Sequence, residues 1–146
     1  YYMHAITLIY VGEFNKALKY INRILNDFEM EARPQVYLRV FILNAIVHFE
    51  LKNYSLVASI VKQIQKINAT MQVLIPIEGK ILQALFKIST AKNLTSKQEV
   101  SFFQNISQEI SELNKNKKTT TDSLIDNYEK WIYSKIKRKP VYLIVK

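Results

Sequence analysis

Residues 5–18 read AITLIYVGEFNKAL, and residues 45–58 read AIVHFELKNYSLVA. Both stretches begin with alanine, carry an aromatic residue nine positions later and place a small or β-branched apolar residue three positions after it. A looser third copy, ALFKISTAKNL, occupies residues 84–94. The leading alanines, Ala5, Ala45 and Ala84, are therefore almost evenly spaced. Self-similarity at such a period indicates stacked supersecondary units, so the chain is predicted to use one helical hairpin repeatedly.

The composition favours long helices joined by short connections. Two glycines and three prolines in 146 residues are too few for the turns of an all-β or doubly wound α/β fold. The length suits one domain with a continuous core. The absence of cysteine excludes disulfides, thiolate nucleophiles and cysteine-based zinc sites. No apolar run approaches the roughly 20 residues that span a bilayer, so no membrane span is expected.

Apolar residues recur at helical spacing along almost the whole chain. Pro34 and Pro76 suit the first turns of two helices, and Asn53 suits an N-cap. Ser96, with Glu99 three residues later, predicts a capping box. The expected helices cover residues 2–11, 14–28 and 34–51, followed by helices that begin after residue 53, at residue 76, near residue 96 and near residue 121 or 122.

The C-terminal part of the chain has a different composition. Residues 115–121 are polar and lack periodicity, so they are predicted to form a linker before a helix over residues 122–139. Pro140 stops this helix, and the β-branched and aromatic residues 141–145 are typical of extended chain. The prediction is therefore an all-α fold: three stacked hairpins over residues 1–114, the linker, a capping C-terminal helix and an extended tail over residues 140–146.

The predicted hairpin resembles the tetratricopeptide repeat. That family places a small residue in the first helix, glycine and an aromatic residue around the turn, and alanine in the second helix. The matching residues are Ala5, Gly12, Phe14 and Ala17 in the first copy, and Ala45, Lys52, Tyr54 and Val57 in the second. The period exceeds the repeat length of the family, and the family's tryptophan and proline are missing. The resemblance implies an α-α superhelix in which Phe14 and Tyr54 are buried within their hairpins.

In the family that the chain resembles, the first helix of each repeat lines a partner-binding groove. The corresponding positions are Tyr2, Ile6, Ile9 and Tyr10, then Arg39, Ile42, Ile46, Phe49 and Glu50, then Glu78, Ile81, Leu85, Ile88 and Ser89. The family's Lys, Arg and Asn clamp for a peptide carboxylate is missing, which excludes that mode of binding. A groove this apolar is expected to be covered. Upstream helices of the same chain, the chain's own tail, or an amphipathic helix or extended segment of a partner could cover it.

No group of residues has the spacing of a catalytic or metal site. His4 and His48 lack an HxxxH or HExxH spacing and a third ligand, so they are interpreted as packing or surface residues. Asp122 and Asp126 share a helix face, where they complement the positive end of the helix. Two glycines cannot build a phosphate-binding loop or a dinucleotide fold. The chain is predicted not to be an enzyme and to hold no cofactor or metal.

The net charge of +9 is concentrated near the C-terminus. Residues 115–146 hold nine lysines and arginines against three acidic residues, whereas residues 1–114 hold twelve against nine. The densest run contains Lys135, Lys137, Arg138 and Lys139. Basic residues in the last turn of a helix complement its negative end. The run is also a candidate basic patch for nucleic acid or another anionic surface, although no recognition motif accompanies it.

These observations favour a non-catalytic, helical-repeat scaffold that mediates protein–protein interaction. The expected partner is a protein or peptide, or upstream helices of the same chain, and the tail offers a route to self-association. The chain begins with Tyr1 rather than Met and is interpreted as the C-terminal part of a larger protein, with a cytoplasmic location. The alternative is a nucleic-acid or anionic-surface module acting through the basic C-terminal helix, which salt-sensitive retention on DNA would distinguish.

Overall fold

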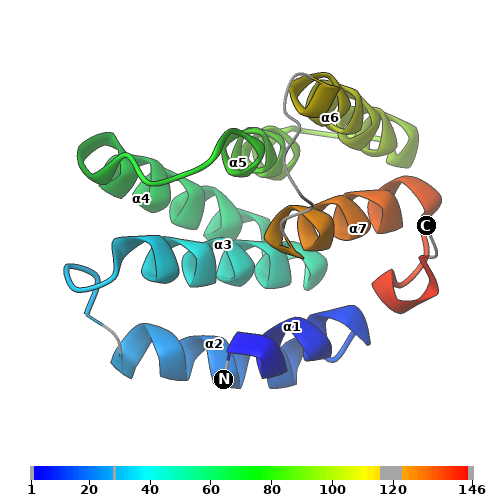
Figure 1. Ribbon diagram of the computed structural model, residues 1–146. Helices are drawn as coiled ribbons and strands as arrows, with labels where there is room; N and C mark the ends of the chain where they lie inside the picture. The colour runs from blue at the N-terminus through cyan, green and yellow to red at the C-terminus, as the bar shows by residue number, and fades with distance from the viewer. Residues whose placement is uncertain (1, 28, 116–122, 145–146) are drawn as a thin grey trace. The chain divides into compact units, whose positions relative to one another are not determined.

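The computed structural model describes residues 2–27, 29–115 and 123–144. Within these ranges the regular structure is entirely helical, which confirms the predicted all-α fold (Figure 1). The elements are α1 (Tyr2–Tyr10), α2 (Phe14–Asp27), α3 (Pro34–Glu50), α4 (Tyr54–Met71), α5 (Pro76–Thr90), α6 (Ser96–Lys115), α7 (Ser123–Lys137) and the short 3-10 helix η1 (Val141–Leu143).

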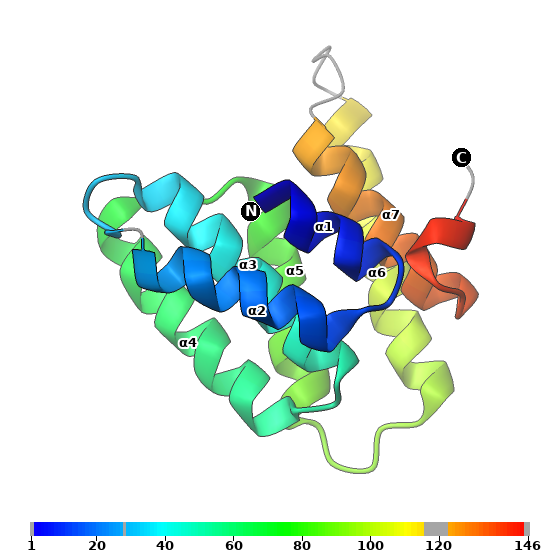
Figure 2. The same cartoon turned by 90° about the horizontal axis from the view of Figure 1, so that it is seen from below.

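The chain forms two compact units, Tyr1–Ala91 and Lys92–Lys146. In the first unit each helix packs against the next one along the chain, and α3 also packs against α5. Figure 1 shows this as layers, with α1 and α2 at the bottom, α3 above them, and α4 and α5 on top. Figure 2, seen from below, looks onto the outer side of α1 and α2. Adjacent helices therefore stack as predicted.

The first two hairpins repeat the same turn. Gly12 has φ 82° and Lys52 has φ 63°, both in the left-handed region. Each lies in a Schellman motif, in which the next N–H reaches back to the last turn of the helix: Glu13 N donates to Leu8 O at 2.8 Å, and Asn53 N donates to His48 O at 2.9 Å. Equivalent residues of the two copies thus end α1 and α3 in the same way.

The burial pattern of the two hairpins also repeats in this register. Small or β-branched residues at the centre of each pair let the two helices approach closely, and the longer apolar residues around them complete the core. The buried equivalent pairs are Ala5 and Ala45, Ile6 and Ile46, Ile9 and Phe49, Ala17 and Val57, Ile21 and Val61, and Ile24 and Ile64. The structure therefore supports the register of the first two copies over the whole hairpin.

The predicted pairing of α5 with α6 would join the two units, and it stays a prediction. Helix α5 belongs to the first unit, where it packs against α4 and α3, whereas α6 belongs to the second unit and packs against α7. The contact between α6 and α7 includes Phe103 and Trp131, whose rings meet edge to face at 5.5 Å. Helix α7 therefore packs against α6 within the second unit. Periodicity marks the apolar stripe of α6 but cannot say which helix covers it.

The capping box of α6 forms one residue earlier than predicted. Thr95 Oγ1 accepts a hydrogen bond from Gln98 N at 3.1 Å, and Gln98 Oε1 accepts one from Thr95 N at 2.9 Å. Ser96 is instead the first residue of the helix. Both Thr95–Gln98 and Ser96–Glu99 satisfy the sequence pattern of a capping box, so only the position of the first helical turn decides between them.

The aromatic residues of the two turns are less buried than predicted. Phe14 and Tyr54 are both half-buried at the start of the second helix of their hairpins. Phe14 packs against the core of α1 and α2, and Tyr54 contacts Phe49 edge to face with ring centroids 5.7 Å apart. Each ring thus covers the end of its hairpin instead of lying wholly inside it.

The C-terminal tail is helical over 141–143 and not extended as predicted. Val141–Leu143 forms η1, which packs against α7. Among residues 141–144, Val141 is buried, Tyr142 and Leu143 are exposed and Ile144 is half-buried. Two 3-10 hydrogen bonds, from Leu143 N to Pro140 O and from Ile144 N to Val141 O, close the turn. The predicted linker lies outside the described residues except for Lys115, which ends α6.

Candidate functional site

The groove positions that the resemblance implies are mostly covered in the folded chain. Tyr2, Tyr10 and Arg39 are half-buried. The buried positions are Ile6, Ile9, Ile42, Ile46, Phe49, Ile81, Leu85 and Ile88. A partner could reach these apolar side chains only by displacing what covers them.

Two charged groove positions meet inside the first unit. Arg39 Nε of α3 lies 3.4 Å from Glu78 Oε2 of α5, and the Glu78 side chain is fully buried. Glu78 Oε1 also accepts a hydrogen bond from Ile75 N at 3.0 Å, at the start of α5. The Arg39 Nε group has no hydrogen-bond partner, so the contact is an ion pair without hydrogen-bond geometry. This pair joins the first helices of successive repeats and serves the packing of α3 and α5.

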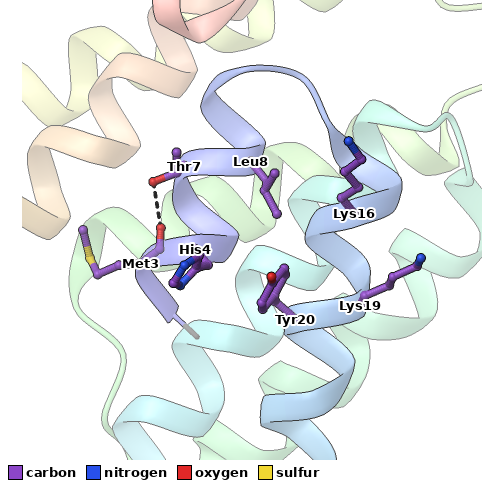
Figure 3. A pocket seen from close by; sticks show the side chains of 7 residues that line it. All are labelled: Met3, His4, Thr7, Leu8, Lys16, Lys19 and Tyr20. Carbon is purple, nitrogen blue, oxygen red and sulfur yellow. Dashed lines mark hydrogen bonds between the residues drawn. The ribbon is translucent and has the colours of Figure 1, made fainter.

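An open hollow lies between α1 and α2 (Figure 3). Its volume is about 600 Å³, and its lining comes from the exposed side of the two helices. The lining residues are Met3, His4, Thr7 and Leu8 of α1, and Lys16, Lys19 and Tyr20 of α2. Sequence reasoning assigned no binding role to these residues.

The floor of the hollow is aromatic and apolar. The His4 and Tyr20 rings stack with centroids 5.4 Å apart and an interplanar angle of 11°. Thr7 Oγ1 donates to Met3 O at 2.9 Å, which turns the polar atom of Thr7 toward its own helix (Figure 3). The Met3 side chain is 67% exposed, and Leu8 is half-buried. The surface therefore combines a flexible thioether, a flat aromatic pair and aliphatic carbon, which suits the apolar side chains of a partner.

Two lysines add positive charge beside this floor. Lys16 and Lys19 line the side of the hollow formed by α2 (Figure 3). Lys16 Nζ lies 3.8 Å from Glu13 Oε2, but both side chains are more than half exposed. An exposed pair of this kind contributes little to stability and exchanges readily. The hollow is thus an apolar site with a cationic edge.

The two histidines lie in separate surroundings. His4 stacks in the hollow, whereas His48 is near the end of α3, where Asn53 Nδ2 lies 3.1 Å from its Nδ1. An amide nitrogen only donates, so this hydrogen bond requires an unprotonated Nδ1. Burial lowers the pKa of His48 from its ordinary value of 6.5. Among the described residues, no three His, Asp or Glu side chains gather as they would around a metal ion.

The basic run ends α7 and continues beyond it. Lys137, Arg138 and Lys139 are exposed, and Lys135 is half-buried. Arg138 has φ 55°, and Lys139 N donates to Ser134 O at 3.1 Å, so the run closes α7 with a left-handed turn.

Two acidic residues, Asp122 and Asp126, are predicted at the start of α7, and the structure describes the second of them. Asp126 pairs with Lys130 at 3.1 Å, one turn further along the helix. Asp122 lies outside the described residues. Asp126 is therefore engaged in a local helix-surface pair.

None of the helices in the described ranges has both the length and the apolar character needed to cross a membrane. Comparison with protein-family models, with curated proteins and with solved structures found no match to this chain.

Proposed function

We propose that this chain is a non-catalytic helical-repeat scaffold that holds a protein partner on the outer side of its first hairpin. The observation that carries the proposal is the hollow between α1 and α2, where Met3 is 67% exposed next to the stacked rings of His4 and Tyr20. Methionine and aromatic residues are enriched in protein interfaces, and a polar edge around an apolar centre is the usual arrangement.

The covered groove positions have no part in this proposal. Ile42, Ile46 and Leu85 are almost completely buried, so their side chains contribute to the fold. The hollow offers apolar surface without any rearrangement, because its side chains are already open to solvent. Pre-formed surfaces avoid the energetic cost of ordering or uncovering a site.

Site-specific photo-crosslinking in cells tests this function. A photoreactive amino acid at Met3 should yield a discrete protein adduct, because that side chain projects from the hollow. The same amino acid at Gln65, an exposed position on α4, is the matched control and should not yield that adduct. Absence of any Met3-specific adduct would overturn the proposal.

A second candidate function is binding of nucleic acid or another anionic surface. It is favoured by three consecutive exposed cations, Lys137, Arg138 and Lys139. Fluorescence anisotropy with a labelled duplex DNA at about 0.15 M salt tests it, because phosphate contacts weaken steeply as salt rises. Replacing the three cations with glutamine should abolish such binding, and absence of binding by the unaltered chain would refute this candidate.

A further inference from the structure

Comparison of the repeats indicates what kind of segment fits the hollow. In α3, two positions face the second helix of the preceding hairpin. Met3, Leu43 and Leu82 are equivalent in the register that aligns Ala5, Ala45 and Ala84. The other equivalent set contains Thr7, Val47 and Phe86. The exposure of these residues indicates whether another helix packs against the first helix of each repeat.

In α3 both positions are covered by α2. Leu43 is 8% exposed and Val47 is fully buried. Both belong to the same core cluster as Ala17, Ile21 and Ile24 of α2, and α2 packs against α3. A helix with an apolar stripe therefore occupies this face in the second repeat.

The same arrangement recurs in α5, which packs against α4. Leu82 is 1% exposed. The ring of Phe86 lies beneath Lys62 of α4, whose Nζ is 5.7 Å from the ring centroid. The position of Val47 and Phe86 thus contacts the preceding helix in two successive repeats.

In α1 the equivalent positions are open. Met3 and Thr7 are exposed, and both line the hollow. The margin of this face also differs in charge between the two repeats: Lys16 and Lys19 stand where α4 has the exposed residues Leu56 and Ser59. The first repeat therefore has an uncovered face at these positions, with two cations beside it.

We infer that the hollow between α1 and α2 docks an amphipathic α-helix of a partner protein, with acidic side chains beside its apolar stripe. The inference rests on the proposed function and specifies the partner. The helix takes the place that α2 has on α3, so its apolar side chains cover Met3, Thr7 and the His4–Tyr20 stack. Its carboxylates face Lys16 and Lys19. A second copy of this chain fits less well, because the face and the whole chain are both positively charged.

Two labelled peptides test this inference. The first copies residues 14–27, the sequence of α2, with Glu in place of Lys16, Lys19 and Arg23. The second has the unaltered sequence and therefore the same apolar stripe with the opposite charge. In fluorescence anisotropy at about 0.15 M salt, the acidic peptide should bind at least about tenfold more tightly than the basic one.

Variants of the chain locate the binding site. Met3→Glu should weaken binding of the acidic peptide about tenfold or more, since it places a negative charge on the surface that the helix covers. The double change Lys16→Glu with Lys19→Glu should reverse the preference between the two peptides. Lys66→Glu, at an exposed position on α4, is the matched control and should leave binding unchanged. All these positions are exposed, so the melting temperature should not fall.

Each contrary result overturns the inference in a distinguishable way. Equal binding of both peptides would exclude charge recognition, and binding insensitive to Met3→Glu would place the peptide elsewhere. Sedimentation showing a dimer that Met3→Glu dissociates would make a second copy the occupant. Failure of both peptides to bind, with the Met3 crosslink intact, would leave the scaffold function standing and exclude a helix of this kind as its partner.

Discussion

Arg39 and Glu78 stand at the same interval along the chain as Ala45 and Ala84, and they form an ion pair with Nε and Oε2 3.4 Å apart. The two side chains therefore occupy equivalent positions in successive repeats and connect α3 with α5. Glu78 is fully buried, whereas the Arg39 side chain is 28% exposed. A buried carboxylate depends on its cation more than a partly exposed guanidinium depends on its anion.

Arg39→Met should therefore lower the free energy of unfolding by about 2 kcal/mol or more, because Glu78 loses its guanidinium while staying buried. Arg33→Met, at an exposed position before α3, is the control and should change stability by less than about 0.5 kcal/mol. Urea denaturation followed by circular dichroism measures both. Equally small effects of the two substitutions would show that the Arg39–Glu78 ion pair does not stabilise the folded chain.

The left-handed turn residues predict opposite effects of glycine at equivalent positions. Lys52→Gly should stabilise the chain by about 1 kcal/mol, since it relieves the φ of 63°. Gly12→Ala should destabilise it by about 1 kcal/mol for the same reason, although open space surrounds the site. Gly79→Ala, inside α5 and also in open space, should stabilise by roughly 0.5–1 kcal/mol through helix propensity. Thermal unfolding checks the three signs, and a stabilising Gly12→Ala would contradict the shared turn geometry.

His48 predicts a loss of stability on mild acidification. Because burial lowers its pKa in the folded chain, the unfolded chain takes up the proton more readily below pH 6.5. The contribution of neutral His48 is complete above that pH and is lost as the pH falls from 6.5 through the lowered folded pKa. His48→Gln should reduce this part of the pH dependence in denaturation curves between pH 7.5 and about pH 5. His4→Gln leaves His48 in place and should retain this pH dependence of stability. An unchanged pH dependence in His48→Gln would exclude His48 as its source.

The tail predicts a contrast between two neighbouring residues. Val141 is buried and Tyr142 is 57% exposed, and η1 packs against α7. Val141→Asp should destabilise the second unit by about 2 kcal/mol, since it buries a charged group, whereas Tyr142→Asp should change stability by less than about 0.5 kcal/mol. Equal effects in chemical denaturation would show that η1 does not dock through Val141.

The aromatic contact of the second unit should be energetically coupled. Phe103 and Trp131 are both buried, with rings edge to face at 5.5 Å. In a double-mutant cycle with Phe103→Leu and Trp131→Leu, the interaction term should be about 0.5–1.5 kcal/mol. A cycle with Phe103→Leu and Val141→Ala provides the comparison within the same unit and should give a smaller term. Additive effects of the two aromatic changes would contradict the edge-to-face contact as a source of stability.

The sequence predicted the starts of several helices to within a residue. Pro34 and Pro76 begin α3 and α5 as expected. Asn53 immediately precedes α4, but its side chain contacts His48 and makes no capping hydrogen bond. The capping box was displaced by one residue because two overlapping patterns compete. For the hollow, the available signal was the comparison of Met3 and Thr7 with their equivalents in the second copy, Leu43 and Val47. That comparison identifies a face only after the packing of α2 on α3 is seen.

The sequence by itself determined the helices, the register of the first two hairpins and the turn at Gly12 and Lys52, because apolar periodicity and backbone stereochemistry act over short stretches of chain. The tertiary structure decided that α6 pairs with α7, that the carboxylate of Glu78 is buried beside Arg39, and that Met3 stays open while Leu43 is covered. Those outcomes depend on which side chains meet between segments that are distant in the sequence. Burial in a core is a property of the whole packing arrangement, and equivalent residues in a repeat can have opposite environments when only one of them has a helix against it.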